Sequence, residues 1–328
     1  MKQKTFLLHK LTGEALKLFV QKKPEFIIVG ASGWLGMATL QLLSDHLKIS
    51  EKVTCFGSIK KTLKLLDGTT LVQHPLEELS DYPKGKADYL LNYAFLTKEN
   101  ERTFKQQEYI KLNRQISIKV FNEAKRIRVA NLSTISSGSV YSKERSIVSD
   151  LSKNPYGYLK KEEEVLFSGL KDLGMKVVIP RVFNLSGPYS NKKEFYMFSS
   201  LLAQALKSNE MVITSKKRIF RSFVSTSDLL STIFGSMKLL NEGESVIYDT
   251  CGDSVVEIGE LALQVKDLIN KKAKIIRPDI DESLSPDKYI GSRSEYESLI
   301  NKLEIKESSL QDQIVNTSEY MKVAYNLK

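Results

Sequence analysis

Two side chains with acid–base potential stand four residues apart, Tyr156 and Lys160, near the start of a predicted helix over 154–170. That spacing puts both on one helix face. A free tyrosine titrates near pH ~10, so proton exchange at neutral pH requires its pKa to fall by about 3 units, or roughly 4 kcal/mol. A cation at about 4 Å supplies that energy at an effective dielectric of about 20. The pair therefore predicts an acid–base tyrosine that a lysine ammonium and a further cationic group nearby would assist.

A row of hydroxyl side chains precedes this pair. Ser133, Thr134, Ser136 and Ser137 stand together at the end of a predicted strand over 129–136. Ser137 is placed to donate a hydrogen bond to the substrate oxygen that the tyrosine would protonate. A tyrosine and a lysine at this spacing also arise by chance in a chain with 14 tyrosines, and then mark only a helix with an ion-pairing lysine. The order of the motifs along the chain favours the catalytic interpretation.

A glycine-rich turn lies near the start of the chain. Gly30, Gly33 and Gly36 follow four apolar residues, 26–29, and precede apolar residues at helical spacing. The first glycine permits a sharp turn, the second lets backbone approach a pyrophosphate, and the third lets the helix pack closely on the strand. Free N–H groups at the helix start then face the anion. The turn predicts a dinucleotide site, the alternative being a purely structural turn.

Strands and helices alternate through the first half of the chain. Strands are predicted at 26–29, 53–56, 70–72, 89–94, 129–136 and 177–179, and long helices at 109–127 and 154–170. This alternation predicts an α/β fold, a doubly wound parallel sheet of the Rossmann type whose ligands bind at the carboxyl ends of the strands. The rhythm breaks after about residue 182. Predicted helices at 195–208 and 256–270 and short strands within 211–226 then indicate a smaller, mostly helical lobe over the sheet edge.

We therefore expect three parts in the chain. Residues 1–24 form an N-terminal helical extension, residues 25–182 the cofactor-binding Rossmann domain, and residues 183–328 the substrate-binding lobe, with strands near 220–250 returning to the sheet. Apolar residues at helical spacing predict that the extension is an amphipathic helix docked on the core. They are Leu8, Leu11, Ala15, Leu18 and Phe19.

The net charge is +10, from 49 lysines and arginines against 39 aspartates and glutamates in 328 residues. Such a balance suits acidic small molecules as well as nucleic acid. The lysine pairs are scattered and carry no interleaved aromatic motif, so we expect no nucleic-acid partner. Two distant cysteines and three unclustered histidines predict neither a disulfide framework nor a metal site. No apolar run approaches the roughly 18 residues of a membrane span, and the N-terminus lacks the apolar core of a signal peptide, so we expect a cytoplasmic protein without membrane contact.

A series of motifs, in order, resembles those of the extended short-chain dehydrogenase/reductases, in the group of nucleotide-sugar epimerases and dehydratases. The resemblance covers roughly residues 25 to 325 and is specific for the group, not for one reaction within it. The matching positions are the glycine turn 30–36, the strand end Asn92-Tyr93-Ala94-Phe95, Asn113, Ser136 to Tyr141, the Tyr156/Lys160 pair, Arg181 to Pro188, and Arg221 to Val224 with Asp228.

The resemblance implies a role for each matching residue. The implied catalytic residues are Ser137, Tyr156 and Lys160. The implied cofactor-binding residues are Gly30, Ser32, Gly33, Trp34, Leu35, Gly36, Tyr93, Ala94, Phe95, Asn113, Arg181 and, again, Tyr156 and Lys160. Gly138, Asn184 and Arg221 are implied to bind the substrate, with Arg221 meeting the diphosphate of a nucleotide sugar.

Two departures from the group's pattern bear on the cofactor. Phe95 is bulkier than the usual alanine at the end of its strand. Gly57 stands where members that prefer NAD carry an acidic residue for the ribose hydroxyls. Nothing at that position repels a 2′-phosphate, and Ser58 and Lys60 are placed to contact one. We therefore expect NADP or NAD as the cofactor, with NADP favoured.

The resemblance implies hydride transfer at a sugar carbon of a nucleotide sugar, by an epimerase or a 4-keto reductase with Tyr156 as acid and base. Related dehydratases place an Asp-Glu pair directly after the catalytic hydroxyl, where this chain has Gly138 and Ser139, so we do not expect dehydration. The glycine should instead leave room for the sugar to turn. The alternatives are a nucleotide-sugar dehydratase and a non-catalytic NAD(P)-sensing regulator on the same fold, which would not need Ser137, Tyr156 and Lys160.

The predicted helices at 109–127 and 154–170 carry apolar residues on more than one face, as if a second layer covered them. Related proteins pair through these two helices as a four-helix bundle. We therefore expect a homodimer.

Overall fold

The computed structural model describes residues 9–19, 23–191 and 195–325, and a sheet of nine strands lies at its centre. In spatial order the strands are β13 (Ser245–Asp249), β8 (Lys176–Val182), β6 (Asn131–Thr134), β5 (Tyr89–Asn92), β1 (Phe26–Val29), β2 (Val53–Gly57), β4 (Thr70–Pro75) and β3 (Lys61–Lys64), with β7 (Ser136–Ser137) also paired to β8. All these pairings are parallel except that of β3 with β4. The strand order reverses between β1 and β5, and ligands of a doubly wound sheet bind at such a switch point.

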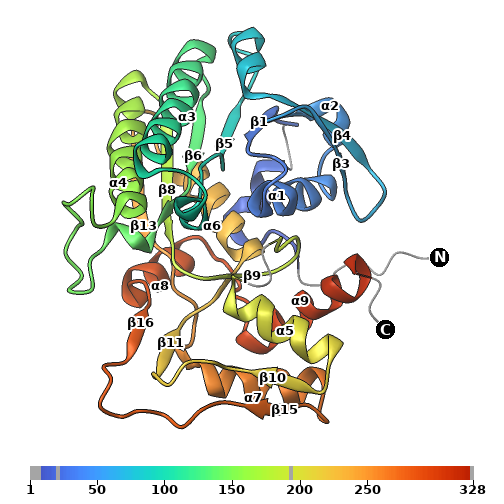
Figure 1. Cartoon of the computed structure of the whole chain (residues 1–328). Helices are drawn as coiled ribbons and strands as arrows, with labels where there is room; N and C mark the ends of the chain where they lie inside the picture. The colour runs from blue at the N-terminus through green and yellow to red at the C-terminus, as the bar shows by residue number, and fades with distance from the viewer. Residues whose placement is uncertain (1–8, 20–22, 192–194, 326–328) are drawn as a thin grey trace.

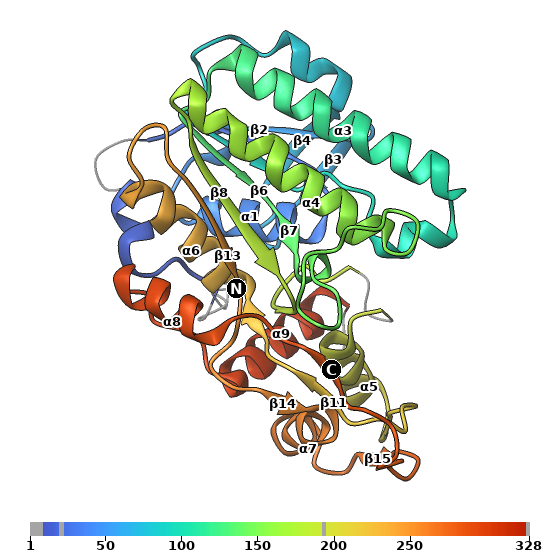
Figure 2. The ribbon, with the colours of Figure 1, turned by 90° about the vertical axis from the view of Figure 1, so that its left-hand side faces the viewer.

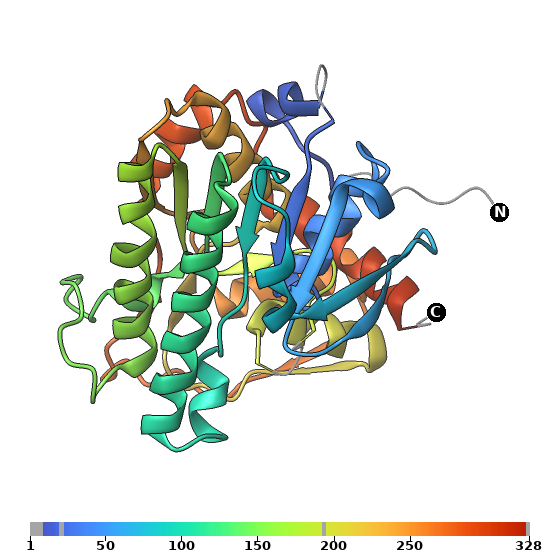
Figure 3. The ribbon, with the colours of Figure 1, turned by 90° about the horizontal axis from the view of Figure 1, so that it is seen from above.

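Both faces of the sheet are buried. In β1, Ile27 and Val29 belong to one hydrophobic core and Phe26 and Ile28 to the other, because successive side chains of a strand point to opposite faces. Helices α3 and α4 contribute to the first core and α1 and α6 to the second. Their bounds are α1 (Trp34–Ser44), α3 (Gln106–Ile127), α4 (Pro155–Ser168) and α6 (Thr226–Leu239), and the short α2 (Ile49–Lys52) leads into β2. Figures 1 and 3 show α3 and α4 side by side on their face of the sheet.

The remaining elements form a lobe, which lies below the sheet in Figures 1 and 2. Its helices are α5 (Met197–Lys207), α7 (Ile258–Ile269) and α9 (Leu310–Ala324), while α8 (Arg293–Lys302) contacts β13. Three small sheets accompany them: β10 (Glu210–Val212) with β15 (Lys274–Ile276), β11 (Ile219–Arg221) between β14 (Val256–Glu257) and β16 (Asp287–Tyr289), and β9 (Leu185–Ser186) with β12 (Val224–Ser225). Because β13 joins the main sheet and α6 packs on it, the later half of the chain contributes to the sheet region as well as to the lobe.

The predicted fold class is confirmed, with three differences in detail. The edge strand β3 was not predicted, because only Leu63 of its four residues is buried and so it shows no strand-like apolar pattern. The predicted strand over 129–136 is divided at Ile135 into β6 and β7. The short strands predicted within 211–226 pair among the small sheets of the lobe and do not join the main sheet.

The N-terminal extension docks on the core, but its helix is shorter than predicted. A 3-10 helix spans Gly13–Phe19. The chain turns at Gly13, where φ is +61° and a Cβ atom would lie 2.2 Å from the carbonyl oxygen of Leu303, so the helix cannot continue backwards through this residue. Glu14 N donates to the same carbonyl at 2.9 Å. Leu8, the first residue of the predicted apolar pattern, lies outside the described residues.

Within the described residues, no helix has both the length and the apolar character needed to cross a membrane. Nor does this part of the chain bring three His, Cys, Asp or Glu side chains together where they could hold a metal ion. Cys55 and Cys251 are both free and buried.

Candidate active site

A cleft of about 800 Å³ opens at the carboxyl ends of β1, β5 and β6 and is closed on its far side by the lobe. It brings together predicted site residues that are widely separated in sequence. These are Gly33, Trp34, Leu35, Tyr93, Phe95, Ser137, Tyr156, Lys160, Asn184 and Arg221. Asp287 and Tyr289 of β16, which the sequence did not single out, line the same cleft.

The glycine turn has the backbone shape that a diphosphate requires. At Gly30 φ is +79°, and a Cβ atom there would lie 2.8 Å from the backbone nitrogen of Ala94. Gly33 N donates to Gly30 O at 3.0 Å and closes the turn. Gly33 is also the N-cap of α1, and no side chain caps the N–H groups of the first helical turn. A helix N-terminus left open in this way, at the edge of a cleft, fits a dinucleotide diphosphate.

Gln73 of β4 lies beside the turn at the end of β2. A Cβ atom on Gly57 would lie 2.3 Å from the Gln73 side-chain amide, so a larger residue there would displace this amide. Gln73 Oε1 accepts from Ser32 N at 2.9 Å, and Nε2 donates to Ile59 O at 2.9 Å. The side chain beside Gly57 is therefore a buried, neutral amide, whereas members of the group that prefer NAD carry an acidic residue at this position. Ser58, the next residue, is exposed.

Helix α4 begins at a position fixed by its own sequence. Asn154 caps it by accepting from Gly157 N at 3.0 Å, and Pro155 fits the first helical position. Asn154 Nδ2 also donates to Ser139 O at 3.0 Å, which ties the helix start to the segment that follows β7. These contacts place Tyr156 at the wall of the cleft.

Lys160 is anchored by a carbonyl oxygen, a carboxylate and an aromatic ring. Its Nζ donates to Ile135 O and to Glu163 Oε2, each at 2.7 Å, and the Phe95 ring centroid lies 3.7 Å from it. Burial raises the pKa of Tyr156 well above 10, only partly offset by a hydrogen bond from Ser137. Burial therefore outweighs the expected lowering of this pKa by the lysine ammonium.

Ser137 has an unexpected partner from the lobe. Its Oγ lies 3.1 Å from Tyr289 Oη and also accepts from Ser139 N at 3.1 Å. The space beside Gly138 is filled, since a Cβ atom there would lie 2.4 Å from the ring of Phe183. This corrects the expectation that Gly138 opens room for the sugar, because the glycine instead accommodates a packed aromatic ring.

Two residues implied to bind the cofactor support the walls of the cleft without lining it. Asn113 is fully buried and pins the segment after β5, accepting from Leu96 N at 2.8 Å and donating to Leu96 O at 3.3 Å. Arg181 makes a two-pronged ion pair with Glu164, at 2.7 and 2.8 Å, and also donates to Tyr141 Oη. Both are therefore engaged by neighbouring protein groups.

The lobe side of the cleft carries the residues implied to bind substrate. Arg221 pairs with Asp287 at 3.0 Å. Asn184 Nδ2 donates to Ser222 O at 3.1 Å and to Tyr289 O at 3.0 Å. The two side chains thus hold β16 across the mouth of the site.

The chain matches a family model and is similar to several known proteins. A family model described as the NAD dependent epimerase/dehydratase family matches residues 26–248. UDP-glucuronic acid decarboxylase 5 of Arabidopsis thaliana is 28% identical over 113 residues, which are 34% of this chain and 32% of the plant protein. The chain thus spans about a third of the length of the curated relatives it matches.

Solved structures share the fold at low sequence identity. UDP-N-acetylglucosamine 4-epimerase from Methanobrevibacter ruminantium M1, in complex with UDP-N-acetylmuramic acid, has a TM-score of 0.72 at 17% identity, covering 92% of this chain and 99% of that one. MoeE5 in complex with UDP-glucuronic acid and NAD has a TM-score of 0.69 at 17% identity, with the same coverage of both chains.

Proposed function

Because this chain belongs to the NAD dependent epimerase/dehydratase family, we propose that it acts on a nucleotide sugar, as an epimerase or a 4-keto reductase with Tyr156 as the proton-transfer residue. The observation that carries the proposal is the single cleft that Gly33, Ser137, Tyr156 and Arg221 share. MoeE5 and the Methanobrevibacter epimerase are complexes with UDP-sugars, which supports a UDP-sugar as the first candidate.

Each group of the chain has a defined task in this proposal. Residues of the turn 30–36 would hold the diphosphate of NADP or NAD, with Tyr156 and Lys160 at the nicotinamide end. The bound nicotinamide supplies the hydride acceptor or donor. Tyr156 takes a proton from the sugar hydroxyl when the carbon is oxidised and returns it to the carbonyl oxygen when the carbon is reduced. Ser137 donates a hydrogen bond to the same oxygen.

The ionisation of Tyr156 bears on the direction of reaction. Since burial raises its pKa well above 10, the ligand-free protein holds it as a neutral phenol at pH 7. A phenol is the proton donor that carbonyl reduction needs, whereas an epimerase uses the phenol and the phenolate in turn. Both reactions use the phenol as the proton donor to a carbonyl oxygen, and the oxidation of a sugar hydroxyl needs cationic groups beside Tyr156 to lower this pKa.

The dehydratase alternative requires a base for C5 and an acid for C6 beside the sugar. Gly138 and Ser139 supply neither. The acidic side chains that line the cleft are Glu99 and Asp287, not adjacent in sequence, and Asp287 is paired with Arg221. We therefore do not propose dehydration.

One experiment tests the function. The protein is incubated with UDP-, dTDP-, CDP- and GDP-hexoses and their 4-keto forms, with NADP(H) and NAD(H), and products are identified by mass spectrometry and NMR. We expect an epimer of unchanged mass, or a product two hydrogens heavier from a keto sugar. A product lighter by one water at a catalytic rate would show a dehydratase. Cofactor binding without turnover of any sugar would favour the regulator.

Replacing Arg221 by alanine should raise KM with little change in cofactor affinity, because its fork can meet phosphate oxygens. A charge-assisted hydrogen bond contributes about 1.5–3 kcal/mol, so we expect KM to rise roughly 10- to 100-fold. Arg218→Ala is the matched control, since this arginine pairs with Glu282 on the surface of the same lobe. An unchanged KM in Arg221→Ala would show that Arg221 only holds β16 in place and does not bind the substrate.

Calorimetry with both cofactors should show tighter binding of NADP than of NAD. Gln73 is neutral and fills the position beside Gly57, so no carboxylate repels a 2′-phosphate. Ser58 and Lys60 are exposed at the end of β2, where they can reach it. Lys60→Ala should reduce the preference. Tighter binding of NAD by the unaltered protein would contradict this prediction.

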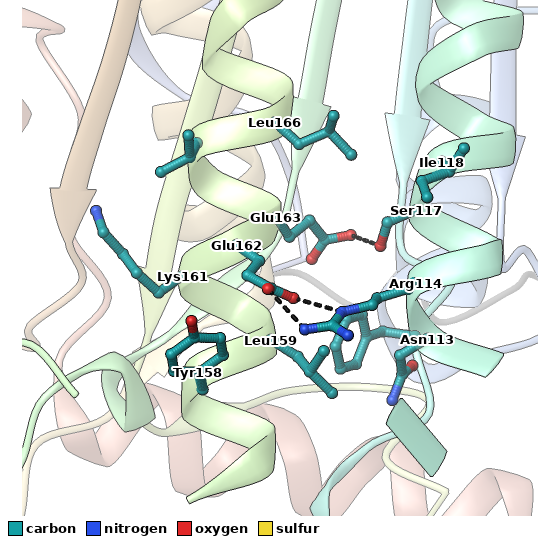
Figure 4. A pocket seen from close by; sticks show the side chains of 12 residues that line it. Asn113, Arg114, Ser117, Ile118, Tyr158, Leu159, Lys161, Glu162, Glu163 and Leu166 are labelled. Atoms are coloured by element: carbon teal, nitrogen blue, oxygen red, sulfur yellow. Dashed lines mark hydrogen bonds and ion pairs between the residues drawn. The ribbon is translucent and has the colours of Figure 1, made fainter. Parts of the chain in front are cut away.

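We also propose that the protein is a homodimer formed through α3 and α4. Ile118 on α3 and Val165 on α4 are 50% and 65% exposed, on the two helices that flank a groove of about 530 Å³ (Figure 4). Light scattering at micromolar concentration should give twice the chain mass, and Val165→Lys should reduce it to one chain. A monomeric unaltered protein would exclude the dimer.

A further inference from the structure

Three consecutive glutamates of α4 bind cations in different directions, and the third of them, Glu164, also binds Lys161 at 3.2 Å. Because each residue advances the helix by about 100°, neighbouring side chains cannot share a partner. The pairs are Glu162 with Arg114 at 2.8 Å, Glu163 with Lys160 at 2.7 Å and Glu164 with Arg181 at 2.7 Å. The first pair is half exposed on the surface and the third supports the wall of the cleft. Only the second reaches a residue of the catalytic pair.

The Glu163 carboxylate is held in one orientation by groups from two further elements. Ser117 Oγ of α3 donates to its Oε1 at 3.1 Å, and Asn92 Nδ2 at the end of β5 donates to the same oxygen at 3.3 Å. The other oxygen, Oε2, receives Lys160 Nζ. Figure 4 shows Glu163 and Ser117 facing each other between the two helices. Because the Glu163 side chain is only 2% exposed, water does not compete for these bonds.

Lys160 depends on this carboxylate for its charge. Its side chain is 7% exposed, and burial lowers its pKa, while Glu163 and, more weakly, Glu164 raise it. Buried lysines without a counter-ion are known with pKa values of about 5–6, so they are neutral at pH 7. The other contacts of Lys160 Nζ are the Ile135 carbonyl oxygen and the ring of Phe95, and neither carries a negative charge.

We propose that Glu163 is a positioning residue that keeps the Lys160 ammonium protonated and fixed in the wall of the cleft that Tyr156 also lines. Its catalytic consequence rests on the proposed function, in which Tyr156 transfers the proton. The other titratable groups that act on this pair are Glu164 on Lys160, and Tyr109 of α3, Tyr196 before α5 and Tyr289 of β16 on Tyr156. All three tyrosines are neutral at pH 7. Glu101 Oε1 accepts from the backbone nitrogen of Tyr156 at 3.1 Å, and Glu163 supplies the nearest negative charge to Lys160 Nζ.

The first test measures Lys160 directly in the ligand-free protein. The lysine ε-carbon signals of 13C-lysine-labelled protein are titrated by NMR, and the Lys160 signal is identified by its absence in Lys160→Arg. In Glu163→Gln, which keeps the shape and loses the charge, we expect the titration midpoint to fall by at least about one pH unit, a tenfold loss of proton affinity. Glu162→Gln, its neighbour on α4, should leave the midpoint unchanged. An unchanged midpoint in Glu163→Gln overturns the proposal.

The unaltered protein provides a test that does not depend on the variant folding. At pH 7 its Lys160 signal should be that of a protonated amine. A neutral Lys160 in the unaltered protein overturns the proposal.

The second test is the pH profile of kcat with the sugar that the product screen identifies. Without its charge, Lys160 no longer favours the phenolate, so the acid limb of Glu163→Gln should move to higher pH and kcat at pH 7 should fall about tenfold or more. Glu163→Asp, which keeps the charge on a shorter side chain, should recover part of the loss. A fall of kcat by the same factor at every pH, with no shift of the acid limb, would indicate a merely structural role. A shift of the acid limb to lower pH would show that Lys160 stays charged without Glu163. Either result overturns the proposal.

The two tests also separate this inference from the proposed function. If Tyr156 is not the proton-transfer residue, the kcat profile fails while the NMR titration still shows the dependence of Lys160 on Glu163. If the Lys160 midpoint is unchanged in Glu163→Gln, the proposal for Glu163 is wrong, and that result says nothing against proton transfer by Tyr156.

Discussion

Tyr156→Phe should reduce turnover by about 100- to 10,000-fold, the usual contribution of a general acid–base group, while the protein still folds and binds its cofactor. Only the hydroxyl is lost, because the phenylalanine ring keeps the edge-to-face contact with Phe95, whose centroid lies 5.8 Å away. Steady-state kinetics, calorimetric cofactor binding and thermal unfolding measure the three quantities on one sample.

Tyr158→Phe is the matched control for this variant. Tyr158 lies on the same helix but faces the outer groove between α3 and α4 and does not line the cleft (Figure 4). We expect its kcat to stay within a factor of about two of the unaltered protein, because it has no proton to exchange with the substrate. Near-normal turnover in Tyr156→Phe would remove Tyr156 from the mechanism and with it the proposed reaction.

Gly30→Ala should be among the most destabilising single changes in the cofactor domain. Two costs add at this position. The backbone has φ of +79°, a left-handed conformation that costs an L-residue about 1–2 kcal/mol. The new Cβ would also lie 2.8 Å from Ala94 N and from Tyr93 C, and overpacking against backbone costs about 1–3 kcal/mol more. We expect the unfolding temperature to fall by several degrees. Cofactor affinity should also fall, because the turn must move away from the strand end.

Two other glycines separate these costs. Gly174 has φ of +84° and nothing within 4 Å of an added Cβ, so Gly174→Ala should show the backbone cost alone. Gly169 has φ of −63° and equally open space, so Gly169→Ala should be neutral or slightly stabilising. Thermal unfolding ranks the three variants. Equal stability of Gly30→Ala and Gly174→Ala would show that the close approach at residues 93 and 94 has no energetic weight.

The sequence by itself determined the features that depend on local geometry. The four-residue spacing of Tyr156 and Lys160 fixes a shared helix face, and Asn154 and Pro155 fix where that helix begins. A buried apolar run followed by glycines at 30, 33 and 36 is compatible with few local structures other than a strand, a tight turn and the start of a helix. The doubly wound sheet follows from the alternation of such units, and the cleft from the carboxyl ends of its strands.

Some of the missed contacts left a weak trace in the sequence. The acidic run 162–164 follows Lys160 at helical spacings of two to four residues, so an ion pair within the helix could have been predicted from it. Which glutamate makes that pair could not, because only the tertiary structure shows that Glu164 pairs with Arg181 of β8 while Glu163 faces Ser117 of α3.

Only the tertiary structure decided which partners occupy the catalytic groups. Ser137 meets Tyr289, 152 positions away, and Ser32 N is bonded by Gln73, 41 positions away. Arg221 pairs with Asp287, 66 positions away. Each contact brings together segments whose local patterns are unrelated, so neither segment carries information about the other. The ionisation of Tyr156 is likewise decided by the tertiary structure. Its spacing from Lys160 is local, but its pKa is raised by burial and by nearby tyrosines of the lobe and of α3.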